Sequence, residues 1–286
     1  MNRDSSIAIN FGCEVAEVSR SGFYDWKDRP PSERALENAV LVEQIREAHT
    51  KGRGVYGSPR VAVALRNDGI ECGENRIAKL MSENDIRAKT AKKFRVNTTD
   101  SNHDLPIAPR VFKVEDAKAA VMAPNQVWVG DITYVETCEG WLFLAIFLDL
   151  FTRKIVGFST EEHMRTEMVV QALDMGIKRQ NVTETFLIVH ADRGVQYAAS
   201  EFRSKLDDEG FIASMSRKGN CYDNAFAESF FHTLKTELIY LTKFATREEA
   251  KRAIFEYIEV FYNRERLHSG IEYLTPEQCE KLAFAA

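Results

Sequence analysis

Three acidic residues, in or near apolar segments, have no evident structural role in the sequence around them. Asp131 interrupts the apolar, alternating run Trp128-Val-Gly-Asp-Ile-Thr-Tyr134, and an unpaired carboxylate in a dry sheet is strongly unfavourable. Asp192 comes just after Phe186-Leu-Ile-Val189, a branched apolar run that indicates a buried strand. Glu228 follows Asp192 with 35 residues between them. Three acids so placed are candidates for one site.

The chemistry that such a set supports is metal-assisted phosphoryl transfer. No catalytic Ser, His or Cys constellation accompanies the three carboxylates, and hard oxygen ligands suit Mg²⁺ or Mn²⁺. In a site with two ions, one activates the attacking water or hydroxyl and the other stabilises the leaving oxygen. We therefore expect Asp131, Asp192 and Glu228 to be both the catalytic residues and the ligands of two divalent ions.

The segment before Glu228 predicts how that acid is presented. Gly219-Asn-Cys-Tyr-Asp-Asn224 breaks the chain and offers Asp223 or Asn224 as the N-cap of a helix over residues 225–235. At 100° per residue, one stripe of this helix is polar and another is apolar. The polar stripe holds Asn224, Glu228 and Lys235, and the apolar stripe holds Phe226, Phe230 and Leu234.

Three extended motifs carry a family resemblance: W-x-x-D-I-T-Y, H-x-D-x-G-x-Q-Y and G-N-x-x-D-N-A-x-A-E-S-F-F-x-x-L-K. From about Ser19 to the C-terminus the chain resembles the second-frame transposases of insertion sequence family three. Its acids resemble the DDE triad of insertion-sequence transposases and retroviral integrases. The resemblance implies DNA cleavage at an element's end by water and then strand transfer by the freed 3′-hydroxyl, with Lys235 contacting terminal DNA.

The same resemblance implies partners. They are the terminal repeats of the element, target DNA, further copies of the chain in a homo-oligomer on DNA, and an upstream-frame product as fusion or partner. Five scattered cysteines, with no signal peptide and no apolar run long enough to span a membrane, predict a cytoplasmic protein. The net charge of −5 opposes a wholly basic surface, although residues 1–95 carry 17 basic against 14 acidic side chains.

The elements around the acids predict a ribonuclease H-like α/β core with a mixed five-stranded sheet, as the family also implies. Three antiparallel strands are expected first, then helices and strands in alternation up to the Glu228 helix. The predicted strands are 127–135, 142–148, 154–160, one at Phe186 and 211–215, and the predicted helices are 166–179, 200–209 and 225–235.

An all-α region resembling a helix-turn-helix is predicted ahead of the core. Ser58 is the expected N-cap of one helix, with Pro59 at the first helical position, and the next helix, over residues 74–83, exposes Arg76 and Lys79. These two cations are predicted to face DNA. A plain three-helix module with a solvated charged face fits the pattern equally, and the resemblance favours DNA. Residues 12–29 fit half of a helix-turn-helix or a helical hairpin.

The remaining segments complete the predicted division of the chain. Arg87, Lys89, Lys92, Lys93 and Arg95 form a basic run that leads into a linker. A capping box at Thr246-x-x-Glu249 begins a long helix to Tyr262, Arg264 and Arg266 follow as predicted DNA contacts, and Thr275-Pro276 begins a last helix. The predicted units are 1–54, 55–96, 97–124 (linker), 125–244 (catalytic core) and 245–286.

Three alternative functions compete with an active transposase. A ribonuclease H-like nuclease would not need the helical module, and a DNA-binding regulator would not need the spaced triad. A catalytically inactive remnant is the third, because Gly130 and Ala191 stand beside the acids where relatives commonly have Thr and Ser. Asp149 is expected to be structural, and His190 and His268 are expected to be structural or phosphate contacts rather than general bases.

Overall fold

A five-stranded mixed sheet is the centre of the C-terminal two thirds of the protein. The computed structural model describes residues 5–89, 105–113, 121–182, 186–217 and 221–285. The order across the sheet is β3-β2-β1-β4-β5. The strands are β1 (Val127–Thr137), β2 (Gly140–Asp149), β3 (Ile155–Glu161), β4 (Ile188–Ala191) and β5 (Ile212–Met215).

The pairing matches the predicted ribonuclease H-like topology. Strands β1, β2 and β3 are antiparallel neighbours, and β4 and β5 add in parallel on the other side of β1. The strand predicted at Phe186 was placed too early, because β4 begins at Ile188 and the Phe186 side chain is 76 % exposed. The alternation of branched and polar residues thus located every strand, with errors only at the ends.

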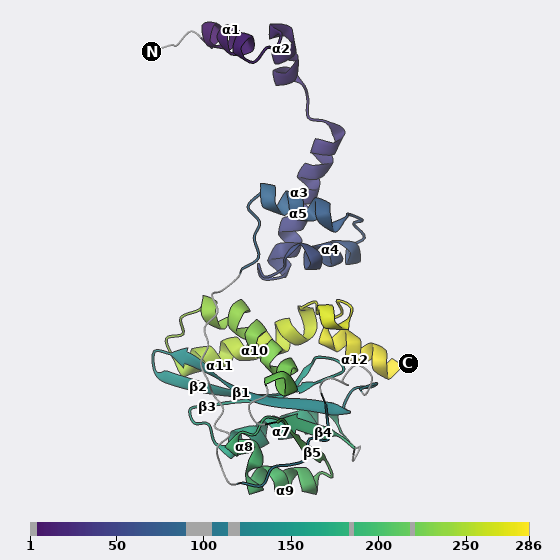
Figure 1. Ribbon diagram of the computed structural model, residues 1–286, viewed down its shortest axis with the longest axis vertical. Helices are drawn as coiled ribbons and strands as arrows, with labels where there is room; N and C mark the ends of the chain where they lie inside the picture. The colour runs from purple at the N-terminus through teal and green to yellow at the C-terminus, as the bar shows by residue number, and fades with distance from the viewer. Residues whose placement is uncertain (1–4, 90–104, 114–120, 183–185, 218–220, 286) are drawn as a thin grey trace.

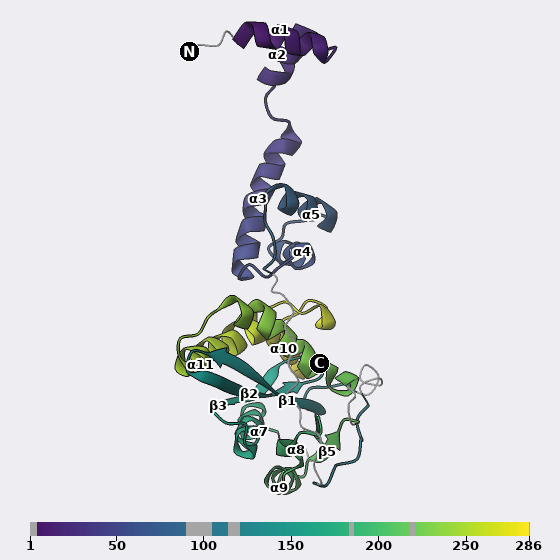
Figure 2. The ribbon, with the colours of Figure 1, turned by 60° about the vertical axis from the view of Figure 1, so that its left-hand side comes forward.

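Two layers of helices enclose this sheet. Figures 1 and 2 show α7, α8 and α9 on one face and α10, α11 and α12 on the other. Trp128, Phe147 and Phe202 belong to the first core, and Val129, Phe230 and Phe261 to the second. The helices of the core are α7 (Thr166–Gln180), α8 (Val195–Ala198), α9 (Ser200–Asp208), α10 (Ala225–Glu237), α11 (Arg247–Glu256) and α12 (Pro276–Ala285). Short η2 (Cys221–Asn224), η3 (Ile239–Leu241) and η5 (Ser269–Ile271) connect them.

A three-helix module precedes the core. Helices α3 (Glu33–Lys51), α4 (Ser58–Asn67) and α5 (Glu74–Glu83) bury Ile45, Val61, Leu65 and Ile77 against one another. Ser58 is not the N-cap of α4 as predicted: Gly57 takes that position in an extended conformation, and Ser58 is the first helical residue. Farther out, α1 (Ser5–Val15) and α2 (Arg20–Asp28) form a separate helical hairpin, and α2 has no buried residue (Figure 1).

The C-terminal helices differ from the single long helix predicted over 248–262. Helix α11 passes at Tyr257 into a nine-residue π-helix, η4 (Tyr257–Glu265). Asn263 on η4 accepts from the Ile155 backbone N–H and donates to the Ile155 carbonyl, both at 3.0 Å. The amide therefore imitates a strand partner at the edge of β3. The predicted capping box is half formed: the Thr246 hydroxyl accepts from the Glu249 N–H at 3.1 Å, but the Glu249 carboxylate accepts from the Ala245 N–H at 2.7 Å, one residue before the N-cap.

Part of the predicted linker and basic run, including Lys92, Lys93 and Arg95, lies outside the described residues. Within the described ranges, no helix has both the length and the apolar character needed to cross a bilayer.

Candidate active site

Strands β1 and β4 place the first two acids side by side. In their parallel register Gly130 pairs with Ala191, so Asp131 and Asp192 are the next residue on each strand. Both side chains are half-buried. Asp131 Oδ1 accepts from the Ile132 N–H at 2.8 Å, and Asp192 Oδ1 accepts from the Gly194 N–H at 2.8 Å. Each carboxylate is thus fixed by backbone next to it in the chain.

Helix α10 brings the third acid to the same end of β1. Its inner face packs against the sheet through Phe230 and Leu234. Asn224 holds the N-cap position, but its side-chain amide donates to the Gly130 carbonyl at 3.2 Å. Because Glu228 lies one helical turn after Asn224, this bond sets Glu228 on the stripe near Asp131, with its side chain exposed.

The electrostatics show that the three carboxylates interact. Burial raises the pKa of Asp131 well above its usual range, and the charges of Asp192 and then Glu228 add to the rise. The Ile132 N–H and Lys235 act in the opposite direction. Carboxylates that repel one another in this way are destabilised in their ionised form, and a bound cation would stabilise that form.

Lys235 on α10 is a cation whose charge acts on Asp131. Burial lowers the pKa of Lys235, while Asp131 raises it. Its Nζ atom lies 5.0 Å from the centre of the Tyr134 ring. The predicted stripe of Asn224, Glu228 and Lys235 therefore does face the strand that carries Asp131.

The donor atoms around Asp131 are oxygens of the kind that bind a divalent ion. Across the described ranges, no three His, Cys, Asp or Glu side chains stand close enough to hold a metal in their present positions. Two buried oxygens beside the acids, Tyr197 Oη and Asn224 Oδ1, have no hydrogen-bond partner among the described residues. Burial, followed by the charges of Asp131 and Asp192, raises the pKa of Tyr197 well above its usual range. Carboxylate and amide oxygens are hard donors of the kind that Mg²⁺ binds, so Asp131, Asp192, Glu228 and Asn224 fit the ion in chemistry, while the Tyr197 phenol stays protonated.

Packing against the core explains why residue 130 is a glycine, and the sequence alone did not reveal this. A Cβ atom there would lie 2.7 Å from the Phe147 ring and 3.2 Å from the Tyr197 ring. The absence of a side chain beside Asp131 is therefore required by the core under the strand. Tyr197 itself was overlooked, although its place at the end of H-x-D-x-G-x-Q-Y was the available signal.

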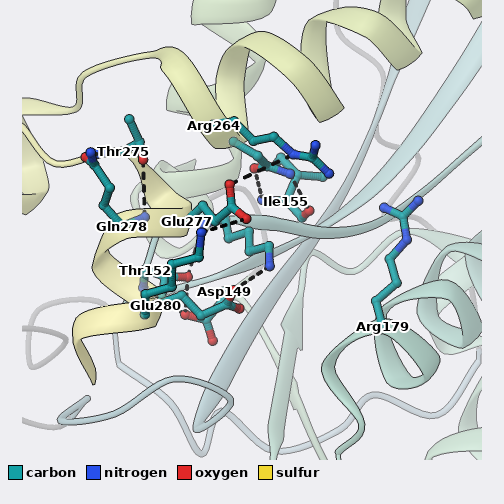
Figure 3. A network of polar contacts seen from close by, with 12 residues as sticks. Asp149, Thr152, Ile155, Arg179, Arg264, Thr275, Glu277, Gln278 and Glu280 are labelled. Atoms are coloured by element: carbon teal, nitrogen blue, oxygen red, sulfur yellow. Dashed lines mark hydrogen bonds and ion pairs between the residues drawn. The ribbon is translucent and has the colours of Figure 1, made fainter. Parts of the chain in front are cut away.

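The acid and histidines excluded on sequence grounds are structural. Asp149 closes the β2–β3 turn by accepting from the Asn125 N–H at 2.7 Å and from the Thr152 N–H and hydroxyl at 2.8 Å (Figure 3). His190 is buried between the hydroxyls of Ser214 and Ser216, and burial lowers its pKa to about 4. His268 is buried with its ring 4.5 Å from that of Tyr262.

Asp223 is not a helix cap but the centre of an arginine clamp. Its carboxylate accepts from the side chains of Arg110 at 2.7 Å and Arg217 at 3.0 Å, and from the Arg217 N–H at 2.8 Å. Burial alone would raise the pKa of Asp223, but the Arg217 hydrogen bonds and the Arg110 charge hold it at about 2. The clamp fixes the segment that leads into α10.

Some of the residues predicted to contact DNA have exposed side chains, and others are held in hydrogen bonds and ion pairs within the protein. Lys79 is 75 % exposed, and Arg264 is 61 % exposed beside Glu277 (Figure 3). Arg76 instead donates to Asn38 at 2.7 and 2.9 Å and to Glu37 at 3.2 Å, which ties α5 to α3. Arg266 is buried and makes a bidentate pair with Glu237 at 2.7 and 2.9 Å, so its side chain is engaged within the protein.

Comparisons with known proteins agree with this architecture. The description "Integrase core domain" matches residues 122–221 and, through a second model, 228–283, and "HTH-like domain" matches residues 35–94. A 31 kDa protein of insertion element IS600 from Shigella sonnei is 45% identical over 92% of this chain and 95% of its own length. The transposase InsF of IS3A from Escherichia coli is 37% identical over 96% of this chain and 95% of its own length.

Among solved structures, a chain from an intasome of simian T-cell lymphotropic virus is similar with a TM-score of 0.48 and 14% identity, over 82% of this chain and 74% of that chain. The family follows from the sequence relatives, whose similarity extends over 92% to 96% of the chain. The chain belongs to the transposases of the IS3 family of insertion sequences.

Proposed function

We propose that this chain is an active transposase that cleaves DNA at the ends of its insertion sequence and joins the freed 3′ end to target DNA. The single observation that carries the proposal is geometric: the register of β1 and β4 sets Asp131 beside Asp192, and Asn224 ties the helix of Glu228 to the same strand. The raised pKa of Asp131, to which Asp192 and Glu228 contribute after burial, agrees with this arrangement. Two strands and a helix thus bring three carboxylates near one another. Their collected negative charge is suited to a metal ion.

Each residue has a proposed part. Asp131, Asp192 and Glu228 would hold one or two Mg²⁺ or Mn²⁺ ions, which supply Lewis acidity to the attacking and leaving oxygens. The Ile132 and Gly194 N–H groups orient the first two carboxylates. Glu228 reaches the ion by rotation of its exposed side chain. Lys235 offsets the negative charge of the terminal phosphate.

DNA recognition is assigned to the helical module and to the exposed cations. Lys79 and Arg264 would contact phosphates, with Lys235 at the terminal nucleotides. Asn224, also predicted to contact DNA, is buried and donates to the Gly130 carbonyl, so it would reach DNA only by leaving that bond. Arg76 reaches DNA only by leaving Asn38 and Glu37. Arg266 is reassigned to holding the C-terminal helices together. Synapsis of two DNA ends implies a homo-oligomer, with the upstream-frame product as fusion or partner, and action in the cytoplasm where the element resides.

The deciding experiment replaces Glu228 with Gln. The change removes one negative charge at an exposed helical position, so the melting temperature and binding of end DNA should stay near wild type. Cleavage and joining of a labelled end fragment with Mg²⁺ or Mn²⁺ should fall on the order of a thousandfold or more.

Glu201→Gln is the matched control, because Glu201 is an exposed glutamate in the first turn of α9 and should keep full activity. Near-normal cleavage by a folded Glu228→Gln protein would remove Glu228 from the site. A wild-type protein that binds the ends without cutting them would instead favour a regulator or an inactive copy.

A further inference from the structure

An aromatic pair lies on the β1–β2 hairpin just beyond the acids. Tyr134 follows Asp131 by three residues on β1, and its ring meets that of Trp141 edge-to-face at 4.8 Å and 86°. Pairing of β1 with β4 ends at Gly130, so Tyr134 pairs with Phe143 of β2 and has no strand on its other side in the part of the chain that the structure describes. Just beyond the acids, β1 is therefore an edge of the sheet, up to the bridge between Thr137 and Phe244.

The pair is open to solvent. Trp141 is 47 % exposed and Tyr134 is half-buried. The buried tryptophan of the same strand pair, Trp128, shows no exposure at all. An indole with nearly half of its surface in water contributes little to the core, and exposed aromatic groups beside a polar site mark surfaces that bind a ligand.

Lys235 connects the aromatic pair with the acids. Its Nζ lies 5.0 Å from the centre of the Tyr134 ring, within the range of a cation–π contact. The same ammonium interacts electrostatically with Asp131. A phosphate that meets Lys235 would thus have the carboxylates on one side and the rings of Tyr134 and Trp141 on the other.

We propose that Tyr134 and Trp141 form a stacking platform for an unpaired base at the DNA end, with Lys235 holding the adjoining phosphate. The inference rests on the proposed function, since a strand that is drawn to the acids must separate from its complement near the cut. A base removed from the duplex loses its stacking, and aromatic side chains restore it for any base. The Lys235 ammonium would pair with the phosphate of a nucleotide, and the Tyr134 and Trp141 rings would contact its base.

The test uses the full-length protein and end DNA whose last two bases are unpaired, with 2-aminopurine as the terminal base. Without divalent metal, no cleavage interferes with the measurement of binding and fluorescence. Wild type should quench the 2-aminopurine and prefer the unpaired end to a blunt end. Trp141→Leu, which keeps an apolar side chain but no aromatic face, should bind the unpaired end about fivefold to a hundredfold more weakly and lose the quenching.

Two controls separate stacking from structure. Trp141→Phe retains an aromatic face and should keep most of the preference, and Phe186→Ala removes an aromatic side chain that is 76 % exposed elsewhere and should change nothing. Equal binding of unpaired and blunt ends by wild type, or an unaltered preference in Trp141→Leu, would overturn the platform while cleavage by wild type upholds the proposed function. If wild type neither binds nor cleaves end DNA, the proposed function itself fails.

Discussion

Three aspartates of the core show how surroundings assign different tasks to one residue type. Asp149 accepts three hydrogen bonds from a turn. Asp223 is clamped by two arginines. Asp131 has one backbone donor beside it and two further carboxylates within electrostatic reach. Of these three environments, that of Asp131 would gain most from a bound cation, and this difference in charge balance supports the proposed site.

The clamp on Asp223 makes stability depend on acidity. The folded pKa of Asp223 is about 2, below the ordinary value of 3.8. A depressed pKa stabilises the fold above the unfolded value, and this contribution disappears as the pH falls from about 4 toward 2. Asp223→Asn should therefore lower the free energy of unfolding by about 2 kcal/mol at pH 7, and the deficit should shrink toward pH 3.

Urea denaturation between pH 7 and pH 3 measures this dependence. Asp85→Asn is the matched control, because Asp85 pairs with Arg87 on the surface and both side chains are at least 80 % exposed. A deficit that stays constant down to pH 3 would mean that Asp223 acts through shape and not through its charge.

At the residue scale, the sequence predicted the acids that stand in recognisable motifs, but not the contacts between residues that lie far apart in the chain. Asp131, Asp192 and Glu228 were selected because each stands in a recognisable local context. The clamp could not be predicted, since Arg110 lies 113 residues before Asp223. The burial of Arg266 also depends on a distant partner, Glu237. Exposure of a cation cannot be inferred from its neighbours in the chain when its counterion comes from another helix.

At the element scale, alternation and helical periodicity predicted the strands and helices, but not how closely they approach. Helix α7 lies against β3 so tightly that a Cβ on Gly157 would be 2.0 Å from the Ala172 carbonyl oxygen and 2.7 Å from the Gly176 nitrogen. Nothing in the local sequence distinguishes this glycine from one in a turn. The π-helical continuation of α11 was equally unpredictable, because the contact of Asn263 with β3 selects it.

Gly157→Ala should therefore destabilise the protein by about 3 kcal/mol or more, since α7 must move away from β3 to admit a methyl group. Gly270→Ala is the control: a Cβ there meets nothing within 4 Å. Thermal unfolding of the two variants compares them directly. Equal melting temperatures would show that α7 shifts on the sheet without difficulty.

At the scale of the whole molecule, the helical module is attached to the C-terminal end of the core. The Tyr56 hydroxyl donates to the Glu265 carbonyl at 3.1 Å and accepts from the Leu267 N–H at 3.0 Å. Arg53 pairs with Glu256 through both of its terminal nitrogens and lies over the Phe261 ring at 4.4 Å. We call these contacts the Tyr56 joint. They join residues more than 200 positions apart, which no local pattern predicts.

The Tyr56 joint should transmit DNA-end recognition to catalysis, because it fixes the module relative to the acids. Tyr56→Phe leaves the buried Leu267 N–H without its acceptor, at a cost of about 1–3 kcal/mol, and addition of Arg53→Ala removes the ion pair. In calorimetry the double variant should show a separate, earlier transition for the module. Cleavage of end DNA should fall more than binding, since the bound end is no longer held at Asp131 and Asp192.

Arg46→Ala, at an exposed surface pair with Glu43, is the control and should alter neither the melting transition nor the cleavage. A double variant that melts in one step and cleaves normally would show that the module and the core work without a fixed joint.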